Sequence, residues 1–322
     1  MAGTSVDRGE VTLAGIDDRP RPERLAVDSY VCVAEAGSVL AGAHTVVLVA
    51  AGMPGTASDG GMDDLAALDA VEAACTQPGG PRRLVAVTSA LVYGAHANNP
   101  LPLVESAVLR PNEGFGAIAG VAEIERRLAS LAGTANVEVT VVRPAPVVTP
   151  GTGDMPGWLT GVQPLAARGG RPARQFLHVD DLAAAVAHMI ETGLGGAVNV
   201  APTGWLSARE VDGILGFDGP AIVLPEDASR RVRRRLARSC STISGEDTMP
   251  FTRFACVVSN TRLVASGFEP EHSNAASLRV AREVAHAAQR RGSKARRRPL
   301  LAIVAACITV VGASWVLRRS GN

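Results

Sequence analysis

Three side chains that lie close together in the sequence carry groups suited to acid–base chemistry. The segment TSALVYGAH places a hydroxyl at Ser89, a phenol at Tyr93 and an imidazole at His96, directly after an apolar run. An imidazole has an ordinary pKa near neutrality, which suits a general base. Each residue also has a structural interpretation. Ser89 can cap a turn at a strand end, Tyr93 can be a packing residue, which we favour, and His96 can lie in a surface loop.

A second group of polar residues, His178, Asp180 and Asp181, has the donor types of a metal site. The aspartates are better explained as the start of a helix, where a carboxylate accepts backbone N–H groups. No third ligand is spaced nearby to complete a coordination shell. We therefore predict no metal site.

A basic segment, SRRVRRRLARS (229–239), is a candidate for contact with phosphate groups. On a helix, Val232 and Leu236 would form the apolar contact, and arginines would cover most of the circumference. The alternative is a solvated helix, because arginine is abundant throughout the chain. Nucleic acid is not an expected partner, since the net charge is only +1 and the cluster lacks aromatic neighbours. The predicted contacts are with anionic lipid headgroups or a substrate phosphate, through Arg230, Arg231, Arg234 and Arg235.

The composition limits the available chemistry. Of the 32 lysine and arginine residues, only Lys294 is a lysine, and it lies in a basic run beside an apolar segment. Any mechanism that needs a lysine inside the folded domain is therefore excluded. The five cysteines have no CxxC spacing, which favours a reducing compartment over a disulfide framework or a zinc site.

The C-terminal segment 299–317, PLLAIVAACITVVGASWVL, contains no charged residue. As a helix it would be about 28 Å long, close to the thickness of the hydrocarbon core of a bilayer. Basic residues flank both ends, with more before the segment than after it, so the positive-inside rule places the main domain in the cytoplasm. We predict a single-pass protein of the cell membrane with a C-terminal transmembrane helix and a basic linker at 285–298. The alternative is a buried C-terminal helix.

The candidate residues lie on a predicted alternation of strands and helices. Short β-branched runs alternate with helical patterns, which is typical of βαβ units and a parallel sheet. The expected strands are 11–16, 30–34, 45–51, 84–89, 138–142 and 197–200. The expected helices are 62–76, the later part of 115–131, and 180–191 with an aspartate as its N-cap.

Five segments together resemble the NAD-dependent epimerase/dehydratase family, the extended short-chain dehydrogenase/reductases. They are TSALVYGAHANNPLPLVESAVLRPN (88–112), VVRPAPVVTPG (141–151), QFLHVDDLAAAV (175–186), GGAVNVAP (195–202) and SNTRLVASGFEPEHS (259–273). The resemblance implies an α/β fold with a Rossmann-like parallel sheet and a smaller C-terminal substrate lobe. Residues 1–155 would form the NAD(P)-binding-type domain. Residues 156–284 would form the lobe, with strand 197–200 returning to the sheet.

The resemblance also implies NAD or NADP as the cofactor, with contacts at Asp17, Ala50, Ala51, Arg143 and Pro144. Asp17 matches the acid that binds the adenosine ribose. Family members begin with a strand and a Gly-rich turn that holds the pyrophosphate, whereas strand 11–16 here matches their second strand and no GxxGxxG occurs. Without the first strand, its two neighbours would keep unpaired backbone. We therefore expect translation to start upstream of Met1, the alternative being a shortened chain that has lost cofactor binding.

The family's catalytic tyrosine and lysine are also absent. Aligning AEIERRL (122–128) with the family helix places Ala117 at the tyrosine position and Val121 at the lysine position. Neither side chain can move a proton. Ser89 matches the family's active-site serine, which would hydrogen-bond a substrate hydroxyl or carbonyl. Tyr93 and His96 follow it as the other candidates for catalysis.

Two functional classes follow from these observations. The first is a membrane-anchored epimerase or oxidoreductase with altered acid–base residues, acting on a nucleotide-sugar, lipid-linked or steroid-like hydroxyl substrate. The second is a catalytically silent relative that serves as a cofactor-sensing or scaffolding module at the membrane. A homodimer is compatible with both, through Ile118, Ile124 and Leu128 on the helix that often forms the family dimer.

Overall fold

The computed structural model describes most of the chain between residues 40 and 291, together with two short strands before it. The described residues are 11–14, 29–31, 40, 43–50, 60–114, 116–134, 136–150, 165–167, 172–216, 222–224 and 249–291. Several predicted sites fall outside them, namely Asp17, Ala51, the arginines of 229–239 and the apolar segment 299–317. In the part of the chain that is described, no helix has the length and apolar character needed to cross a membrane.

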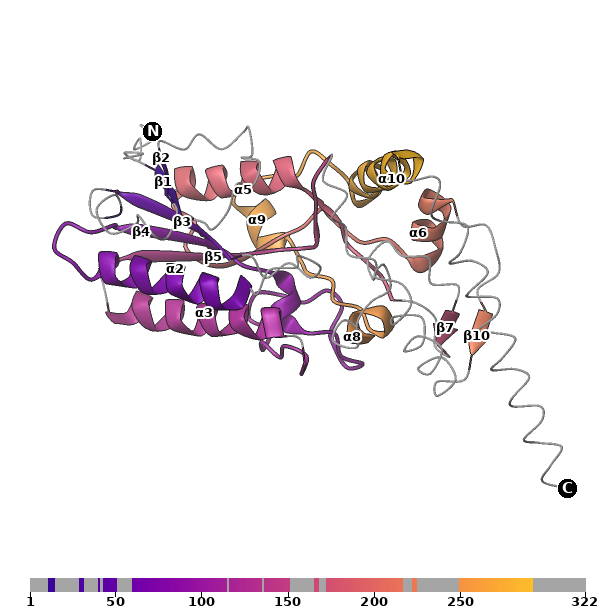
Figure 1. Ribbon diagram of the computed structural model, residues 1–322, viewed down its shortest axis with the longest axis horizontal. Coiled ribbons are helices and arrows are strands. Elements are labelled where there is room, and N and C mark those ends of the chain that lie inside the picture. Colours follow the sequence, from indigo (N-terminus) through magenta and orange to yellow (C-terminus); the bar gives the residue numbers. More distant parts are fainter. Residues whose placement is uncertain are drawn as a thin grey trace, which may run out of the picture.

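Among the described residues, six strands form the main sheet in the order β2-β1-β3-β4-β5-β9 (Figure 1). Every neighbouring pair is parallel. β3 and β4 are rich in valine and leucine and almost wholly buried, as expected for strands covered by helices on both faces. The predicted Rossmann-like parallel sheet is therefore confirmed. The bounds are β1 Val11–Ala14, β2 Ser29–Val31, β3 Thr45–Val49, β4 Arg83–Val87, β5 Glu138–Pro144 and β9 Gly196–Val200.

The pairing of β1 with β3 corrects one expectation. In the order 3-2-1-4-5-6 of the doubly wound fold, another strand would separate these two. Here Val11 lies opposite Thr45 and Ala14 opposite Leu48, so the neighbours pair with each other and leave no gap of unpaired backbone. The chain leaves β1 towards β2 on one side, and leaves β3 towards β4 on the other. A topological switch point thus remains at the ends of β1 and β3, where ligands bind in such sheets, and Ala50 directly follows β3 there.

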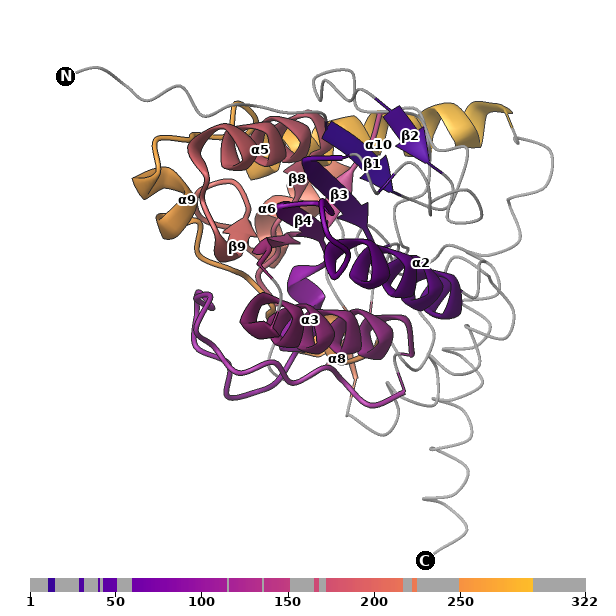
Figure 2. The ribbon, with the colours of Figure 1, turned by 90° about the vertical axis from the view of Figure 1, so that its left-hand side faces the viewer.

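Helices cover both faces of the sheet. α2 (Gly60–Cys75) and α3 (Gly116–Thr134) lie side by side on one face, and α5 (Val179–Thr192) lies on the other (Figures 1 and 2). The apolar side chains of α3 recur at helical spacing and point into the core. Ile118, Ile124 and Leu128 are each 0% exposed, so these three residues cannot form the homodimer contact suggested for them.

The start of α5 also differs from expectation. His178, not an aspartate, is the N-cap, because its Nδ1 accepts a hydrogen bond from the backbone N–H of Asp180 at 3.2 Å. Asp180 and Asp181 lie in the first turn, where negative charge stabilises the positive end of the helix dipole. The carboxylate of Asp181 does not cap the helix. It binds a segment far along the chain, where it accepts the backbone N–H groups of Glu271 and His272 at 3.0 Å each.

α6 (Ala208–Leu215), α8 (Met249–Arg253) and α10 (Asn274–Arg291) lie beyond the ends of the strands, whereas α9 (Thr261–Ala265) packs beside β9 (Figure 1). α10 continues through Arg291, so residues 285–291 of the predicted linker are helical. α6 begins with a reciprocal capping box between Ser207 and Glu210 and packs against α10. The described helices besides α2, α3 and α5 are η3 Ala90–Tyr93 (3-10), α6 Ala208–Leu215, α8 Met249–Arg253, α9 Thr261–Ala265 and α10 Asn274–Arg291. The short strand pairs are β6 Val147–Val148 with β8 Leu177–His178, and β7 Leu165–Ala167 with β10 Ile222–Leu224.

Candidate functional site

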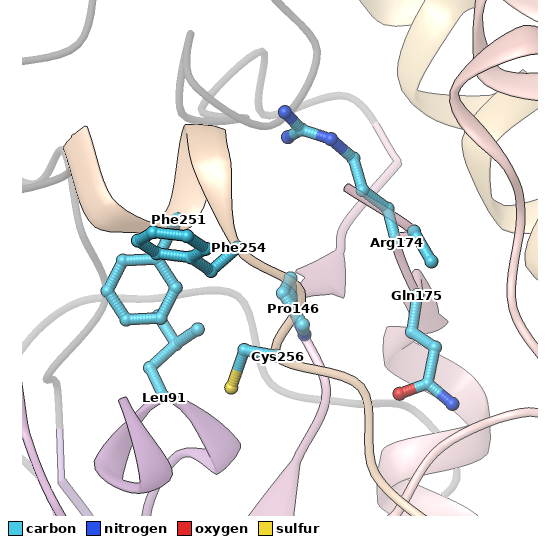
Figure 3. Close-up of a pocket in the computed structure, with 8 residues that line it drawn as sticks. Leu91, Pro146, Arg174, Gln175, Phe251, Phe254 and Cys256 are labelled. Atoms are coloured by element: carbon cyan, nitrogen blue, oxygen red, sulfur yellow. The ribbon is translucent and has the colours of Figure 1, made fainter. Parts of the chain in front are cut away.

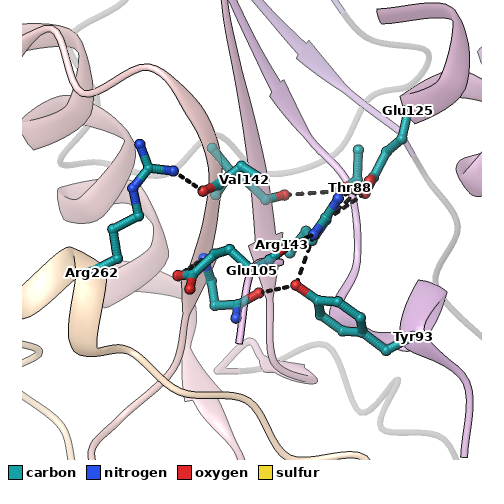
Figure 4. A network of polar contacts seen from close by, with 9 residues as sticks. Thr88, Tyr93, Glu105, Glu125, Val142, Arg143 and Arg262 are labelled. Carbon is teal, nitrogen blue, oxygen red and sulfur yellow. Dashed lines mark hydrogen bonds and ion pairs between the residues drawn. The ribbon is translucent and has the colours of Figure 1, made fainter. Parts of the chain in front are cut away.

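A buried ion pair lies where β4 and β5 end. Arg143, on β5, binds Glu125 of α3 through two nitrogens, with Nη2–Oε2 at 2.7 Å and Nε–Oε2 at 3.0 Å (Figure 4). Their side chains are only 9% and 3% exposed. Thr88, directly after β4, donates its hydroxyl hydrogen to Glu125 Oε1 at 2.7 Å. Burial lowers the pKa of Arg143, but the hydrogen bonds and charge of Glu125 outweigh this and raise it above the ordinary value.

Tyr93 belongs to the same polar network. It is 0% exposed, and its hydroxyl donates to Asn199 Oδ1 at 2.9 Å while accepting from Arg143 Nη1 at 2.7 Å (Figure 4). Burial raises the pKa of Tyr93 above its ordinary value, and the neighbouring Arg143 opposes this only in part. The phenol therefore stays neutral, and its hydrogen is committed to Asn199. Both hydrogen-bonding sides of this hydroxyl thus have protein partners, and a catalytic role for Tyr93 stays a prediction.

The network extends to the loop that follows η3. Glu105 accepts the backbone N–H of Asn199 at 3.1 Å, and its backbone oxygen accepts from Arg143 Nη1 at 3.1 Å. Asn199 Nδ2 also donates to the backbone oxygen of Leu103 at 3.3 Å. The family resemblance predicts a cofactor contact for Arg143, and no local pattern in the sequence marks Glu105 or Asn199 as its neighbours. The contact of Arg143 with a cofactor stays a prediction, whereas its guanidinium group lies among the three protein partners described here.

Ser89 is the N-cap of η3. Its Oγ accepts the backbone N–H of Leu91 at 3.2 Å, and the residue is 6% exposed. This is the turn-capping arrangement considered from the sequence. The hydroxyl can still donate its own hydrogen to a ligand.

His96 lies in a tightly bonded loop. Its Nε2 is 2.7 Å from the backbone oxygen of Arg110, and because a carbonyl only accepts, Nε2 must carry the hydrogen. Nδ1 is then the nitrogen with a lone pair. Gly94 has a φ of 68°, and a Cβ there would lie 2.0 Å from the Arg110 oxygen, so glycine is required for this close approach. The imidazole of His96 is thus hydrogen-bonded to the segment at Arg110 that passes close to Gly94.

A small, shallow hollow opens beside η3 and β6 (Figure 3). Its lining residues are Leu91, Pro146, Ala173, Arg174, Gln175, Phe251, Phe254 and Cys256. Although Cys256 is half-buried as a residue, burial raises the pKa of its thiol to about 12. The thiol donates weakly to the backbone oxygen of Ala90 at 3.5 Å, so it is protonated and a poor nucleophile at neutral pH.

The residues considered for a metal site connect the start of α5 with the segment that precedes α10. Fold geometry brings Glu271 and His272 next to Asp181, so the expectation that no third ligand is near is wrong in space. The rings of His178 and His272 stack at 4.0 Å, and His272 Nδ1 lies 3.2 Å from Asp181 Oδ2. Each carboxylate oxygen of Asp181 already accepts a backbone N–H, which accounts for its burial without an ion.

Comparison with known proteins decides the family. The model of the NAD dependent epimerase/dehydratase family matches residues 39–201, about half of the chain. The chain belongs to this family. Curated protein sequences give no match.

Solved structures share the fold of this family member at low identity. UDP-glucose 4-epimerase from Thermotoga maritima, solved with UDP-glucose, is 14% identical with a TM-score of 0.57, covering 87% of this chain and 99% of that one. dTDP-glucose 4,6-dehydratase from Bacillus anthracis, solved with NAD, is 15% identical with a TM-score of 0.54, covering 81% of each chain. RMD from Pseudomonas aeruginosa, solved with NADPH, is 15% identical with a TM-score of 0.53, covering 87% and 99%. By resemblance, the family's cofactor is NAD or NADP.

The residues on α3 do not fit the chemistry of that cofactor. Val121, which the sequence alignment predicts at the position of the family's lysine, is 1% exposed and belongs to the apolar core with Ile118 and Ile124. One turn further along, Glu125 is bound to Arg143. The valine side chain has no polar group, so it can neither bind a ribose hydroxyl nor lower the pKa of a catalytic phenol. We therefore derive no reaction step through NAD or NADP.

The buried pair makes a first prediction. Glu125→Gln keeps the shape of the side chain but leaves the Arg143 charge buried without its counter-ion, so we expect a loss of about 3–5 kcal/mol in unfolding free energy. Urea unfolding of the full-length chain measures this loss. Glu123→Gln is the matched control, because Glu123 pairs with Arg126 on the exposed side of the same helix and should leave the midpoint nearly unchanged. Equal effects of the two variants would show that the buried pair contributes no special stability.

The Cys256 thiol makes a second prediction. Its pKa in the folded chain is about 12 against an ordinary 9.0, so this group stabilises the fold fully below pH 9 and loses that contribution as the pH rises towards 12. At pH 8 we expect iodoacetamide to leave Cys256 unmodified in the native chain and to alkylate it in urea, measured by peptide mass spectrometry. Cys75, buried with a pKa of about 11, serves as a matched internal control. Rapid native alkylation of Cys256 alone would contradict this account.

Proposed function

We propose that this chain is a catalytically silent member of its family, which binds a small molecule without turning it over. The observation that carries the proposal is the burial of Val121 in the core, at the position where the family has its lysine. The sequence offers no other lysine nearby, since the one lysine, Lys294, lies in the basic run just before the apolar segment 299–317. The protein would then act as a ligand- or cofactor-sensing module, or as a scaffold.

The other candidate groups support this proposal. Tyr93 has its hydrogen committed to Asn199, and Ser89 caps η3. His96 has one nitrogen committed to the Arg110 oxygen, and Cys256 keeps its proton at neutral pH. A general acid or base must reach the reacting proton and exchange it. The remaining route to activity is an altered site that uses the free hydrogen of Ser89 and Nδ1 of His96.

A turnover assay tests the proposal. With NAD or NADP and UDP-glucose, the ligand of one solved neighbour, we expect the full-length protein to produce neither reduced nicotinamide nor an epimer of the sugar above the protein-free blank, measured by absorbance and by chromatography. Ser89→Ala should leave every measured activity unchanged, and circular dichroism controls for folding. Oxidation or epimerisation of a sugar that Ser89→Ala abolishes would overturn the silent function and favour the altered-site enzyme.

We further propose that the protein is anchored in the cell membrane by residues 299–317, with the main domain in the cytoplasm. The 19 uncharged residues of this segment support the proposal, as does the basic run just before it. The arginines of 229–239 would add contacts with anionic headgroups once the anchor holds the domain near the surface. Such a location suits a sensing or scaffolding module, because its partners would be concentrated at the membrane.

Charge placed inside the anchor tests this location. The double variant Val304→Arg/Val310→Arg should move the chain from the membrane fraction to the supernatant, because each arginine near the centre of a spanning helix costs about 2.5–3.5 kcal/mol. Val304→Leu/Val310→Leu is the matched control and should stay in the membrane fraction after an alkaline wash. Retention of the arginine variant in washed membranes would rule out 299–317 as the anchor.

A further inference from the structure

We infer that the stacked imidazoles of His178 and His272 form a pH-sensitive contact. The contact holds the segment before α10 against the start of α5 while His178 is neutral, and it releases that segment when His178 takes up a proton. This inference goes beyond the proposed function, since it depends neither on the silent chemistry nor on the membrane anchor.

The position of His178 requires a neutral ring. The residue is buried, and its Nδ1 accepts the backbone N–H of Asp180 as the N-cap of α5. Because a backbone N–H group only donates, Nδ1 must hold a lone pair. A proton on Nδ1 would set two N–H groups against each other and remove the cap. It would also place a positive charge at the positive end of the dipole of α5.

The position of His272 accepts either protonation state. Its Nδ1 is buried, makes no hydrogen bond to the described residues, and lies 3.2 Å from Oδ2 of Asp181. Because a carboxylate oxygen only accepts, the nitrogen facing it carries the hydrogen. A further hydrogen on Nε2 would then charge the ring without breaking a hydrogen bond that the structure shows, and Asp181 would lie next to that charge.

Stacking couples the two rings. Their centroids are 4.0 Å apart and their planes differ by 15°, so two positive charges on the pair would repel each other strongly. Protons therefore bind to the pair in two steps. The first is accommodated on His272 beside Asp181, and the second, on His178, breaks the cap. The opening follows the second step.

The charges around His178 do not replace the lost hydrogen bond. The nearest carboxylate oxygen is Oδ2 of Asp180, 3.6 Å from Nδ1, and that side chain is 37% exposed, so water screens its attraction. Both oxygens of Asp181 accept backbone N–H groups, and Glu271 is exposed. Besides α5, the described elements that pack most closely against β8 are β6 and the start of α10, where residues 147–148 and 274–277 include no titratable side chain.

The cap and the segment before α10 are joined through Asp181. This residue lies in the first turn of α5, is 1% exposed, and accepts the backbone N–H groups of Glu271 and His272. When the cap is lost and the first turn frays, these two hydrogen bonds break with it. Asn274, the first residue of α10, stays bound to the backbone N–H of Phe176 at 2.9 Å. We therefore expect a local opening before α10 and no unfolding of the domain.

The direction of the pH dependence follows from the neutral ring. His178 takes up a proton less readily in the folded chain, where Nδ1 accepts a hydrogen bond, than in the unfolded chain. Its contribution to stability is therefore fully present above about pH 6.5, the ordinary value for histidine, and is lost as the pH falls.

Hydrogen exchange of the full-length protein in detergent tests the inference, with peptides over residues 268–273 followed by mass spectrometry. Labelling times are scaled for the intrinsic pH dependence of amide exchange. Between about pH 7.5 and pH 5 we expect these peptides to lose protection about fivefold, the factor for a typical N-cap, while peptides from β4 and β9 keep theirs.

Two variants separate the imidazole from the fold. His178→Asn supplies a strong N-cap that does not titrate, so protection of 268–273 should be retained at both pH values. His44→Gln is the matched control, because His44 lies just before β3 and outside the contact, and its response should equal that of the unmodified chain. Circular dichroism checks that both variants fold.

The other outcomes overturn the inference in distinguishable ways. An acid response that persists in His178→Asn would place the titrating group elsewhere, and unchanged protection in the unmodified chain would show that the pair is only structural. Loss of protection on adding EDTA at neutral pH would show that a metal ion holds the segment. If His178→Asn fails to fold, NMR of the 15N-histidine-labelled unmodified protein decides, because a hydrogen on Nδ1 of His178 at neutral pH contradicts the inference.

Discussion

The ion pair between Arg143 and Glu125 is the interaction on which the candidate site depends. Two charges this deeply buried are costly unless each finds a partner and further hydrogen bonds. The protein meets that requirement with Thr88, Tyr93 and the Glu105 backbone. As a result, the ends of β4 and β5, helix α3, η3 and the following loop are held in one arrangement. Through Asn199 the arrangement also includes the end of β9.

The same network holds the site in one arrangement and leaves the hydroxyl of Tyr93 without a hydrogen that it can exchange with a substrate. A catalytic acid or base must be able to exchange its proton with a substrate. In this chain the phenol of Tyr93 is part of the support for Arg143, so releasing it would leave a buried cation with fewer acceptors. Family membership therefore fixes the fold, whereas any activity depends on the individual side chains of the site.

The sequence predicted the framework well and the polar network poorly, for physical reasons. The expected strand 45–51 is observed as Thr45–Val49, because a run of β-branched residues is a local signal. Tyr93 and Asn199 are 106 residues apart and meet only after the sheet has formed, so no local pattern connects them. The N-cap of α5 was assigned to an aspartate because aspartate is the commoner cap, but the imidazole of His178 reaches the N–H first. Glu125 offered the one usable signal, a charge on the apolar face of α3.

Val121 shows how packing and chemistry exclude one another at a single position. The side chain is enclosed by core residues, including Ile118 and Ile124, which are 0% exposed. A lysine restored there would place an ammonium group in this apolar environment, where burial lowers its pKa and disfavours its charge. Such a lysine could neither bind a ribose hydroxyl as a cation nor lower the pKa of a phenol. A lysine at position 121 would therefore cost stability unless the core around α3 were repacked.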